Sequence, residues 1–148
     1  MRVVIDPNVW VSGLINPFGT PARVIEAVMT HRCTAIVTHH LLDELGAVLA
    51  RPKFRRWIAI EDAVAFVVAL KREGDLRPDP EETPSMVRDP DDDYLAALAN
   101  AQAAEIVTGD ADLLDADLTP PAITPRQLID RLEQAGPCHQ AAPNLPRK

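Results

Sequence analysis

The feature of this sequence that most constrains its fold is the alternation of short apolar runs with longer stretches of helical periodicity. "RVVID" (residues 2–6) and "CTAIVT" (residues 33–38) are typical of buried strands, and each is followed along the chain by a segment with apolar residues at helical spacing. The pattern returns in "EIVTGD" (residues 105–110) and, more briefly, in "AIT" (residues 122–124). Such alternation predicts an α/β protein, a three-layer α/β/α sandwich with a central parallel sheet.

End signals mark the predicted helices. Thr20 is expected as the N-cap of the first helix, with Pro21 at its first helical position and an end at about residue 31. Further helical segments are "HHLLDELGAVLARPKF", "EDAVAFVVALKREG" closed by Gly74, the stretch after "RDP", and the short "ADLLD". Thr124 and Pro125 begin the terminal helix "TPRQLIDRLEQA". The proline- and acid-rich "DLRPDPEETPSMV" is expected to be an exposed connection.

At 148 residues the chain is expected to form one domain over residues 1–136, followed by a flexible tail over residues 137–148 that lacks periodicity. No apolar run approaches the roughly 20 residues of a membrane span, and the N-terminus carries no export signal, so a cytoplasmic protein is expected. The formal net charge of −7 argues against a protein that holds nucleic acid by a broad basic surface. An enzyme that acts on nucleic acid is not excluded, because metal ions can neutralise a local cluster of carboxylates.

Several acids stand where strands give way to helices. Asp6 ends the first predicted strand and Asp110 ends "EIVTGD", so both are aimed at the carboxyl edge of the parallel sheet, where ligands bind. Taken singly, each also suits a turn or a helix cap. Glu44 lies about 100° from the apolar stripe of its helix and could reach the same edge, whereas Asp43 lies about 160° away from that stripe.

The stretch "RDPDDDYLAALAN" holds more acids than a helix cap needs. Asp89, followed by Pro90, already fills the N-cap position. At about 100° per residue, Asp91 and Asp92 fall within about 60° of the apolar face, whereas Asp93 falls about 160° away and is expected to face solvent. The helix dipole favours an acidic first turn by only about 0.3 to 1 kcal/mol per residue. It does not explain two carboxylates that point inward.

Four stretches, in this order, resemble the PIN-domain family: "VVIDPNVWVSGLINPFGTPARVIEA", "LLDELGAVLARPKF", "RDPDDDYLAALA", and "IVTGDADLL" followed by "ITPRQLI". The resemblance spans roughly residues 2–132 and is nearest to the VapC-type toxins of toxin–antitoxin systems. It implies an α/β/α sandwich and a nuclease that cleaves single-stranded RNA with Mg²⁺ or Mn²⁺. It also implies two partners, a small antitoxin protein and a second copy of the chain in a homodimer.

Carried over by position, the resemblance implies a catalytic, metal-binding set of four acids: Asp6, Glu44, Asp92 and Asp110. Asp93 is the next-best register for the third acid, and Asp112 is a candidate outer carboxylate. Three polar residues match positions that support the acids by hydrogen bonds: Asn8, Ser12 and Thr108. The chemistry agrees, because Mg²⁺ prefers oxygen ligands and such an ion can activate a water for in-line attack on phosphorus.

One position departs from the family pattern. Pro7 stands where the family usually has a threonine, so a hydroxyl and a backbone donor are missing. The departure favours a second hypothesis, a PIN-like module with an impaired metal site that acts through binding a partner or RNA. A third hypothesis, a receiver domain that accepts phosphate on an aspartate, would need a lysine after a late strand, and neither "EIVTGD" nor "AIT" holds one.

The segment "RPKFRR" places four cations after the helix of Glu44: Arg51, Lys53, Arg55 and Arg56. Two interpretations stay open, namely charges that complement the C-terminus of that helix and a strip that binds RNA phosphates. His39 and His40 open the same helix and are expected to be solvated or to cap it rather than to take part in catalysis.

Overall fold

A parallel sheet forms the centre of the computed structural model, which describes residues 1–80 and 90–135. Its strands are β1 (Arg2–Ile5), β2 (Thr34–Val37), β3 (Asp75–Leu76) and β4 (Glu105–Val107), in the order β3-β2-β1-β4. All pairings between these strands are parallel, and Val4 lies opposite both Ile36 and Ile106. The predicted parallel sheet is confirmed.

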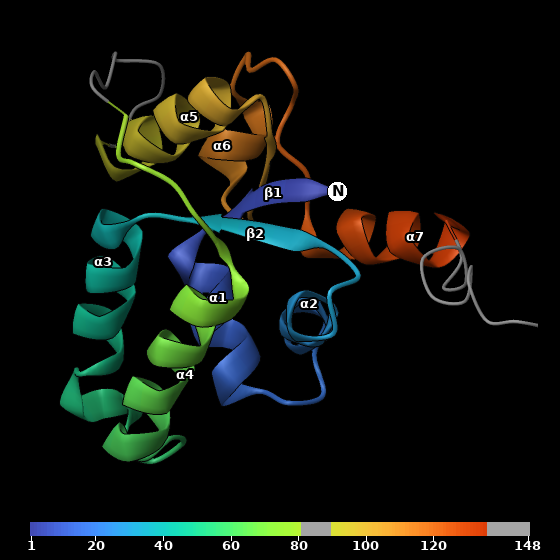
Figure 1. The fold of residues 1–148 in the computed structure, drawn as a ribbon. Coiled ribbons are helices and arrows are strands. Elements are labelled where there is room, and N and C mark those ends of the chain that lie inside the picture. Colours follow the sequence, from blue (N-terminus) through green and yellow to red (C-terminus); the bar gives the residue numbers. More distant parts are fainter. Residues whose placement is uncertain (81–89, 136–148) are drawn as a thin grey trace, which may run out of the picture.

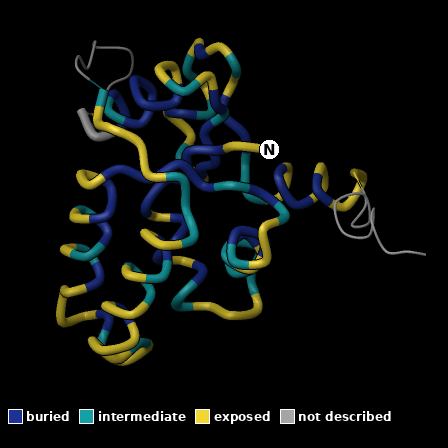
Figure 2. Tube along the Cα trace, viewed as in Figure 1, coloured by how far each residue is buried: buried dark blue, intermediate teal, exposed yellow. Residues whose placement is uncertain are grey.

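Helices cover both faces of the sheet, as predicted (Figure 1). One face carries α5 (Pro90–Gln102) and α6 (Ala111–Asp115). The other carries α1 (Pro7–Ile15), α2 (Thr20–Met29), α3 (His39–Leu49), α4 (Ile60–Glu73) and α7 (Pro125–Ala135). Because successive strand residues point to opposite faces, Val4 packs with α5 and α6, whereas Val3 and Ile5 pack with the five-helix layer. The sheet is therefore buried from both sides (Figure 2).

Most predicted helix ends agree with the structure. Thr124 caps α7: its hydroxyl accepts from the amide of Gln127 at 3.1 Å, and the Gln127 side chain accepts from the amide of Thr124 at 2.8 Å. Gly74 ends α4, where a Cβ would lie only 2.9 Å from the carbonyl oxygen of Leu70. The N-cap of α2 is Gly19 rather than Thr20, so that prediction is wrong by one residue.

Three segments differ from the sequence pattern. Residues 7–15 form α1, although the sequence pattern predicts the first helix only from Thr20. A helix with Val9, Trp10 and Val11 all buried has no clear apolar stripe. Two residues of the predicted connection form β3, which is too short to show a period. The predicted strand "AIT" is reduced to one bridge between Ile123 and Val107. The predicted cap Asp89 and the predicted tail lie outside the described residues.

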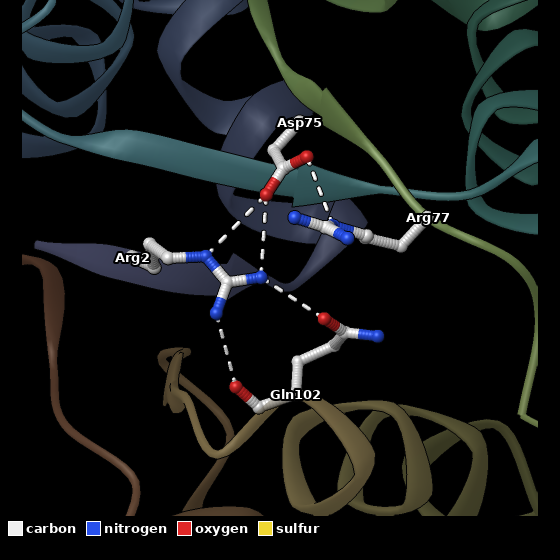
Figure 3. Close-up of polar contacts among 4 residues, drawn as sticks. All are labelled: Arg2, Asp75, Arg77 and Gln102. Atoms are coloured by element: carbon white, nitrogen blue, oxygen red, sulfur yellow. Dashed lines mark hydrogen bonds and ion pairs between the residues drawn. The ribbon is translucent and has the colours of Figure 1, made fainter.

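The amino edge of the sheet is held by an exposed polar network (Figure 3). Arg2, at the start of β1, donates from Nη2 to the side chain of Gln102 at 2.9 Å and to Asp75 Oδ2 at 3.2 Å. Arg77 reaches the other oxygen of Asp75 at 3.0 Å. The network joins β1 and β3 to the C-terminal end of α5.

Within residues 1–80 and 90–135, no helix combines the length and apolar character that crossing a membrane requires.

Candidate active site

Three polar residues lie side by side where the strands end. Asp6 follows β1, Thr38 follows β2 and Thr108 follows β4. The strand register pairs Ile5 with Val107 and Val4 with Ile36, so the residues beyond these pairs are neighbours on one edge. Asp6 is 5% exposed, and both threonines are fully buried. The carboxyl edge thus holds two of the polar residues that the sequence predicts, Asp6 and Thr108, together with Thr38.

Asp6 is held by two hydrogen bonds. Its Oδ1 accepts from the amide of Asn8 at 2.9 Å, which makes Asp6 the N-cap of α1, and its Oδ2 accepts from the Thr108 hydroxyl at 2.8 Å. Burial raises the pKa of this carboxyl, the two hydrogen bonds oppose that rise, and the charge of Asp110 adds to it. A desolvated carboxylate beside a second carboxylate favours binding of a cation.

Asp110 is linked to Asp6 through Thr108. The amide of Asp110 donates to the Thr108 hydroxyl oxygen at 3.0 Å, and that hydroxyl in turn donates to Asp6. Asp110 also caps α6, because its Oδ1 accepts from the amide of Asp112 at 2.8 Å. Thr108 therefore fixes the two acids relative to each other, which is the supporting role predicted for it.

An open cavity of about 330 Å³ lies beside these acids. Its polar lining residues are Asp6, Asn8, Ser12 and Asp110. Pro7 does not disturb this arrangement, because it stands at the first position of α1, where a backbone N–H has no partner within the helix. The structure thus gives Pro7 a place that leaves the cap of Asp6 intact.

The remaining predicted acids lie elsewhere on the edge. Glu44 is half-buried on α3 and Asp43 is exposed, as the helical geometry predicts. Asp92 and Asp93 are both buried, at 7% and 8% exposure, so the prediction that Asp93 faces solvent is wrong. The reason is that residues 95–99 of α5 are all buried, so this alanine-rich helix has no solvent face there. Helical geometry alone does not choose between the two aspartates.

The cavity offers two carboxylates to a hard divalent ion, but the described residues do not bring together a larger set of ligating side chains. Asp6 and Asp110 share a cavity with the oxygen atoms of Asn8 and Ser12, and Mg²⁺ typically takes one or two carboxylates while keeping several waters. In the described ranges 1–80 and 90–135, however, no three acidic, histidine or cysteine side chains lie close enough to hold one ion together. The structure therefore assembles two of the four predicted acids.

The predicted basic strip divides into two parts. Arg51, Lys53 and Arg56 are exposed, and the Arg56 guanidinium lies 4.8 Å from the centre of the Trp57 ring. Arg55 instead donates to the carbonyl of Leu49 at the end of α3, and its Nε and Nη1 atoms are buried. For Arg55 the structure therefore favours the first of the two interpretations, a cation that complements the C-terminal end of α3.

The sequence does not identify three further polar residues of this edge. The Thr38 hydroxyl lies 2.7 Å from that of Tyr94, which in turn donates to Asp79. A threonine directly after a strand is the only signal that the sequence offers for this group.

The match to known proteins agrees with this geometry. Residues 2–112 match the PIN domain family. The chain belongs to the PIN-domain family. Uncharacterized protein MJ1680 of Methanocaldococcus jannaschii is 29% identical to it over 114 residues, which are 77% of this chain and 74% of that protein.

Two solved structures have the same fold as this PIN domain. PAE2754 from Pyrobaculum aerophilum superposes with a TM-score of 0.64 and 17% identity, over 90% of each chain. VapBC2 from Rickettsia felis, bound to a DNA fragment from their promoter, superposes with a TM-score of 0.59 and 14% identity, over 84% of this chain and 97% of that chain. The predicted family and the predicted sandwich are confirmed.

Proposed function

We propose that this PIN-domain protein is a divalent-metal-dependent endoribonuclease that cleaves single-stranded RNA and serves as the toxin of a toxin–antitoxin pair. The observation that carries the proposal is the cavity in which Thr108 fixes Asp6 and Asp110 beside each other. Burying the Asp6 carboxylate beside the charge of Asp110 is unfavourable for folding, and such an arrangement is common at sites that bind a cation.

Asp6 and Asp110 would hold Mg²⁺ or Mn²⁺, with Glu44 and Asp92 as the further acids of the set. A bound ion supplies Lewis-acid chemistry, which activates a water and stabilises charge on the leaving oxygen. The chain's own groups orient the site. Thr108 keeps Asp6 in place, and each Asp6 oxygen accepts one hydrogen bond and retains a lone pair for a ligand.

Substrate binding would use the exposed cations that follow α3. Arg51, Lys53 and Arg56 can contact RNA phosphates, and the half-exposed Trp57 next to them offers a face for a base. The net charge of −7 confines such binding to a local strip. The proposed substrate is therefore a single strand that reaches the cavity from this strip.

A protein partner is the second part of the proposal. Ile60, Val64 and Val68 recur every four residues on α4 and are 40%, 56% and 56% exposed. They border an apolar groove of about 310 Å³ between α3 and α4. The structure from Rickettsia felis is that of VapBC2 bound to a DNA fragment from their promoter, and a basic, DNA-binding partner would complement the acidic charge of this chain. We propose a small antitoxin protein for this groove, and a homodimer for the free toxin.

The test is a cleavage assay with purified protein and a single-stranded RNA, over a titration of Mg²⁺ and Mn²⁺. We expect cleavage that depends on added metal and is abolished by excess EDTA. Asp43→Asn removes one negative charge at an exposed position of α3, and we expect this variant to cleave RNA as wild type does. RNA binding without cleavage at every metal concentration would instead support the impaired module, and undiminished cleavage in EDTA would overturn the proposal.

For the partner, the test is whether a neighbouring reading frame encodes a small DNA-binding protein and whether that protein, co-expressed with this chain, gives a stable complex. Val64→Glu should abolish the complex and leave the cleavage rate unchanged. Light scattering on the free protein should give twice the mass of one chain.

A further inference from the structure

A chain of hydroxyl groups crosses the carboxyl edge on the side away from Asp110. Thr38 caps α3, because its Oγ1 accepts from the amide of Leu41 at 3.1 Å. The same hydroxyl lies 2.7 Å from that of Tyr94, and the Tyr94 hydroxyl is hydrogen-bonded to the carboxylate of Asp79. Three separate segments meet here: the start of α3, the first turns of α5 and the segment after β3.

The direction of these hydrogen bonds is fixed. An ionised carboxylate can only accept, so the Tyr94 hydroxyl donates to Asp79. The pKa of Asp79 is lowered, chiefly by that bond, and the pKa of Tyr94 is raised by burial and by the same bond. Tyr94 therefore keeps its proton for Asp79, and the Thr38 hydroxyl donates to Tyr94. Thr38 and Tyr94 thus connect the N-cap of α3 to Asp79.

The same tyrosine also contacts the helix that carries Glu44. The His40 ring lies 4.2 Å from the Tyr94 ring, and His40 Nε2 lies 3.9 Å from Glu44 Oε1, one turn along α3. The backbone of His40 hydrogen-bonds to Asp79 as well. Asp79 thus holds the first turn of α3 and the hydroxyl of Tyr94 together.

We infer that Tyr94 is a positioning residue, which holds the start of α5 against the start of α3 and so fixes the places of Asp92 and Glu44, the two further acids of the proposed set. The inference rests on the proposed function. Tyr94 follows Asp92 by two residues, and its ring and hydroxyl contact the first turn of the helix that carries Glu44. Tyr94 thus connects the helix that carries Asp92 to the helix that carries Glu44.

The opposite end of α5 supplies a control. Arg2 ties Gln102, at the end of α5, to the amino edge of the sheet, far from the acids (Figure 3). Arg2→Met removes that tie, as Tyr94→Phe removes the hydroxyl tie while keeping the ring beside His40. Both variants are expected to fold and to have slightly lowered melting temperatures. Only Tyr94→Phe should change the affinity for metal.

The experiment is calorimetric titration of Mn²⁺ into wild type, Tyr94→Phe and Arg2→Met, followed by kinetics on single-stranded RNA. We expect Tyr94→Phe to raise the Kd for Mn²⁺ about tenfold, the effect typical of residues that orient metal ligands. Its kcat at a fixed subsaturating Mn²⁺ concentration should fall to a similar extent, with the KM for RNA within about twofold of wild type. Asp79→Asn weakens the same connection and should give a smaller increase in Kd.

A Kd for Tyr94→Phe within twofold of wild type, or an equal increase in Arg2→Met, would overturn the positioning role and leave the proposed nuclease standing. If Tyr94→Phe does not fold, Asp79→Asn decides, and a wild-type Kd in that variant has the same consequence. Wild-type protein that binds no Mn²⁺ and cleaves no RNA would overturn the proposed function, and the inference with it.

Discussion

The two edges of the sheet handle charge in opposite ways. At the amino edge, Arg2 and Asp75 form an ion pair whose side chains are 40% and 25% exposed, and Arg77 adds a second cation to the same carboxylate. At the carboxyl edge, Asp6 is buried, and its pKa is raised by that burial and by the charge of Asp110. Opposite charges meet near the surface at one edge, whereas at the other a buried carboxylate lies beside a second, half-buried carboxylate.

The difference indicates that the amino edge contributes to stability, whereas the carboxyl edge is suited to binding a ligand. Exposed ion pairs typically contribute about 0.2 to 1 kcal/mol, so the amino edge adds a little stability and requires no ligand. The carboxyl edge is less stable than it would be with apolar or neutral residues, and a cation would relieve its repulsion. Such an edge is expected where a protein binds metal, and the following predictions test whether the two edges differ in this way.

The largest effect is expected from Asp6→Asn. It keeps the shape of the side chain but removes the negative charge that Thr108 and the amide of Asn8 hold in the cavity. We expect the cleavage rate to fall about 10²-fold or more, on the scale of losing a group that stabilises charge in the transition state. Asp75→Asn at the amino edge is the matched control and should cleave RNA within about twofold of wild type, because an exposed ion pair contributes little. Equal losses in the two variants would contradict the contrast between the edges.

Asp92→Asn and Asp93→Asn sharpen the assignment of the third acid. Family position selects Asp92, so this variant should also lose about 10²-fold in rate and bind Mn²⁺ more weakly. Asp93→Asn should retain most of the activity. Both variants need circular dichroism to show folding, because both side chains are buried. A larger loss in Asp93→Asn would move the metal-facing role to that residue.

A smaller effect is expected at the basic strip. Replacing Lys53 and Arg56 by alanine should raise the KM for RNA several-fold and make it less dependent on salt, with little change in kcat, because these side chains would contact phosphates away from the cavity. Arg55→Ala should instead lower the melting temperature, since Arg55 completes the end of α3. An unchanged KM in the double variant across a salt series would contradict a role of this strip in RNA binding.

The smallest effect concerns the stability of the metal-free protein. The pKa of Asp6 is raised in the folded state, so its ionised form disfavours folding, and Asp6→Asn should raise the melting temperature by a few degrees at neutral pH. The gain should vanish below about pH 3.9, the ordinary pKa of aspartate, where the carboxyl is protonated in both states. It should grow as the pH rises through the folded pKa. A variant less stable than wild type at neutral pH would contradict this sign.

The sequence predicts the elements whose signals are local. Apolar runs indicate three of the strands. Pro90 marks where α5 begins, and the cap Thr124 marks where α7 begins. Asp6 and Asp110 are predictable for the same reason, because each is a strand-end acid that also caps the next helix.

What the sequence does not predict depends on packing between distant segments. The burial of Asp93 follows from cover on every side of α5, which no count of helical angles reveals. Tyr94 and Asp79 are 15 residues apart, with part of an acid-rich connection between them, and only the fold joins them to Thr38. α1 is missed because its buried residues show no single face.

The most direct test of a metal site at the carboxyl edge is calorimetric binding of Mn²⁺ to wild-type protein, Asp6→Asn and Asp75→Asn at neutral pH. We predict saturable binding at low millimolar metal or below in wild type and in Asp75→Asn, and a loss of most of that binding in Asp6→Asn. Absence of binding to wild type, or equal binding by all three proteins, would contradict the claim that the carboxyl edge is a metal site.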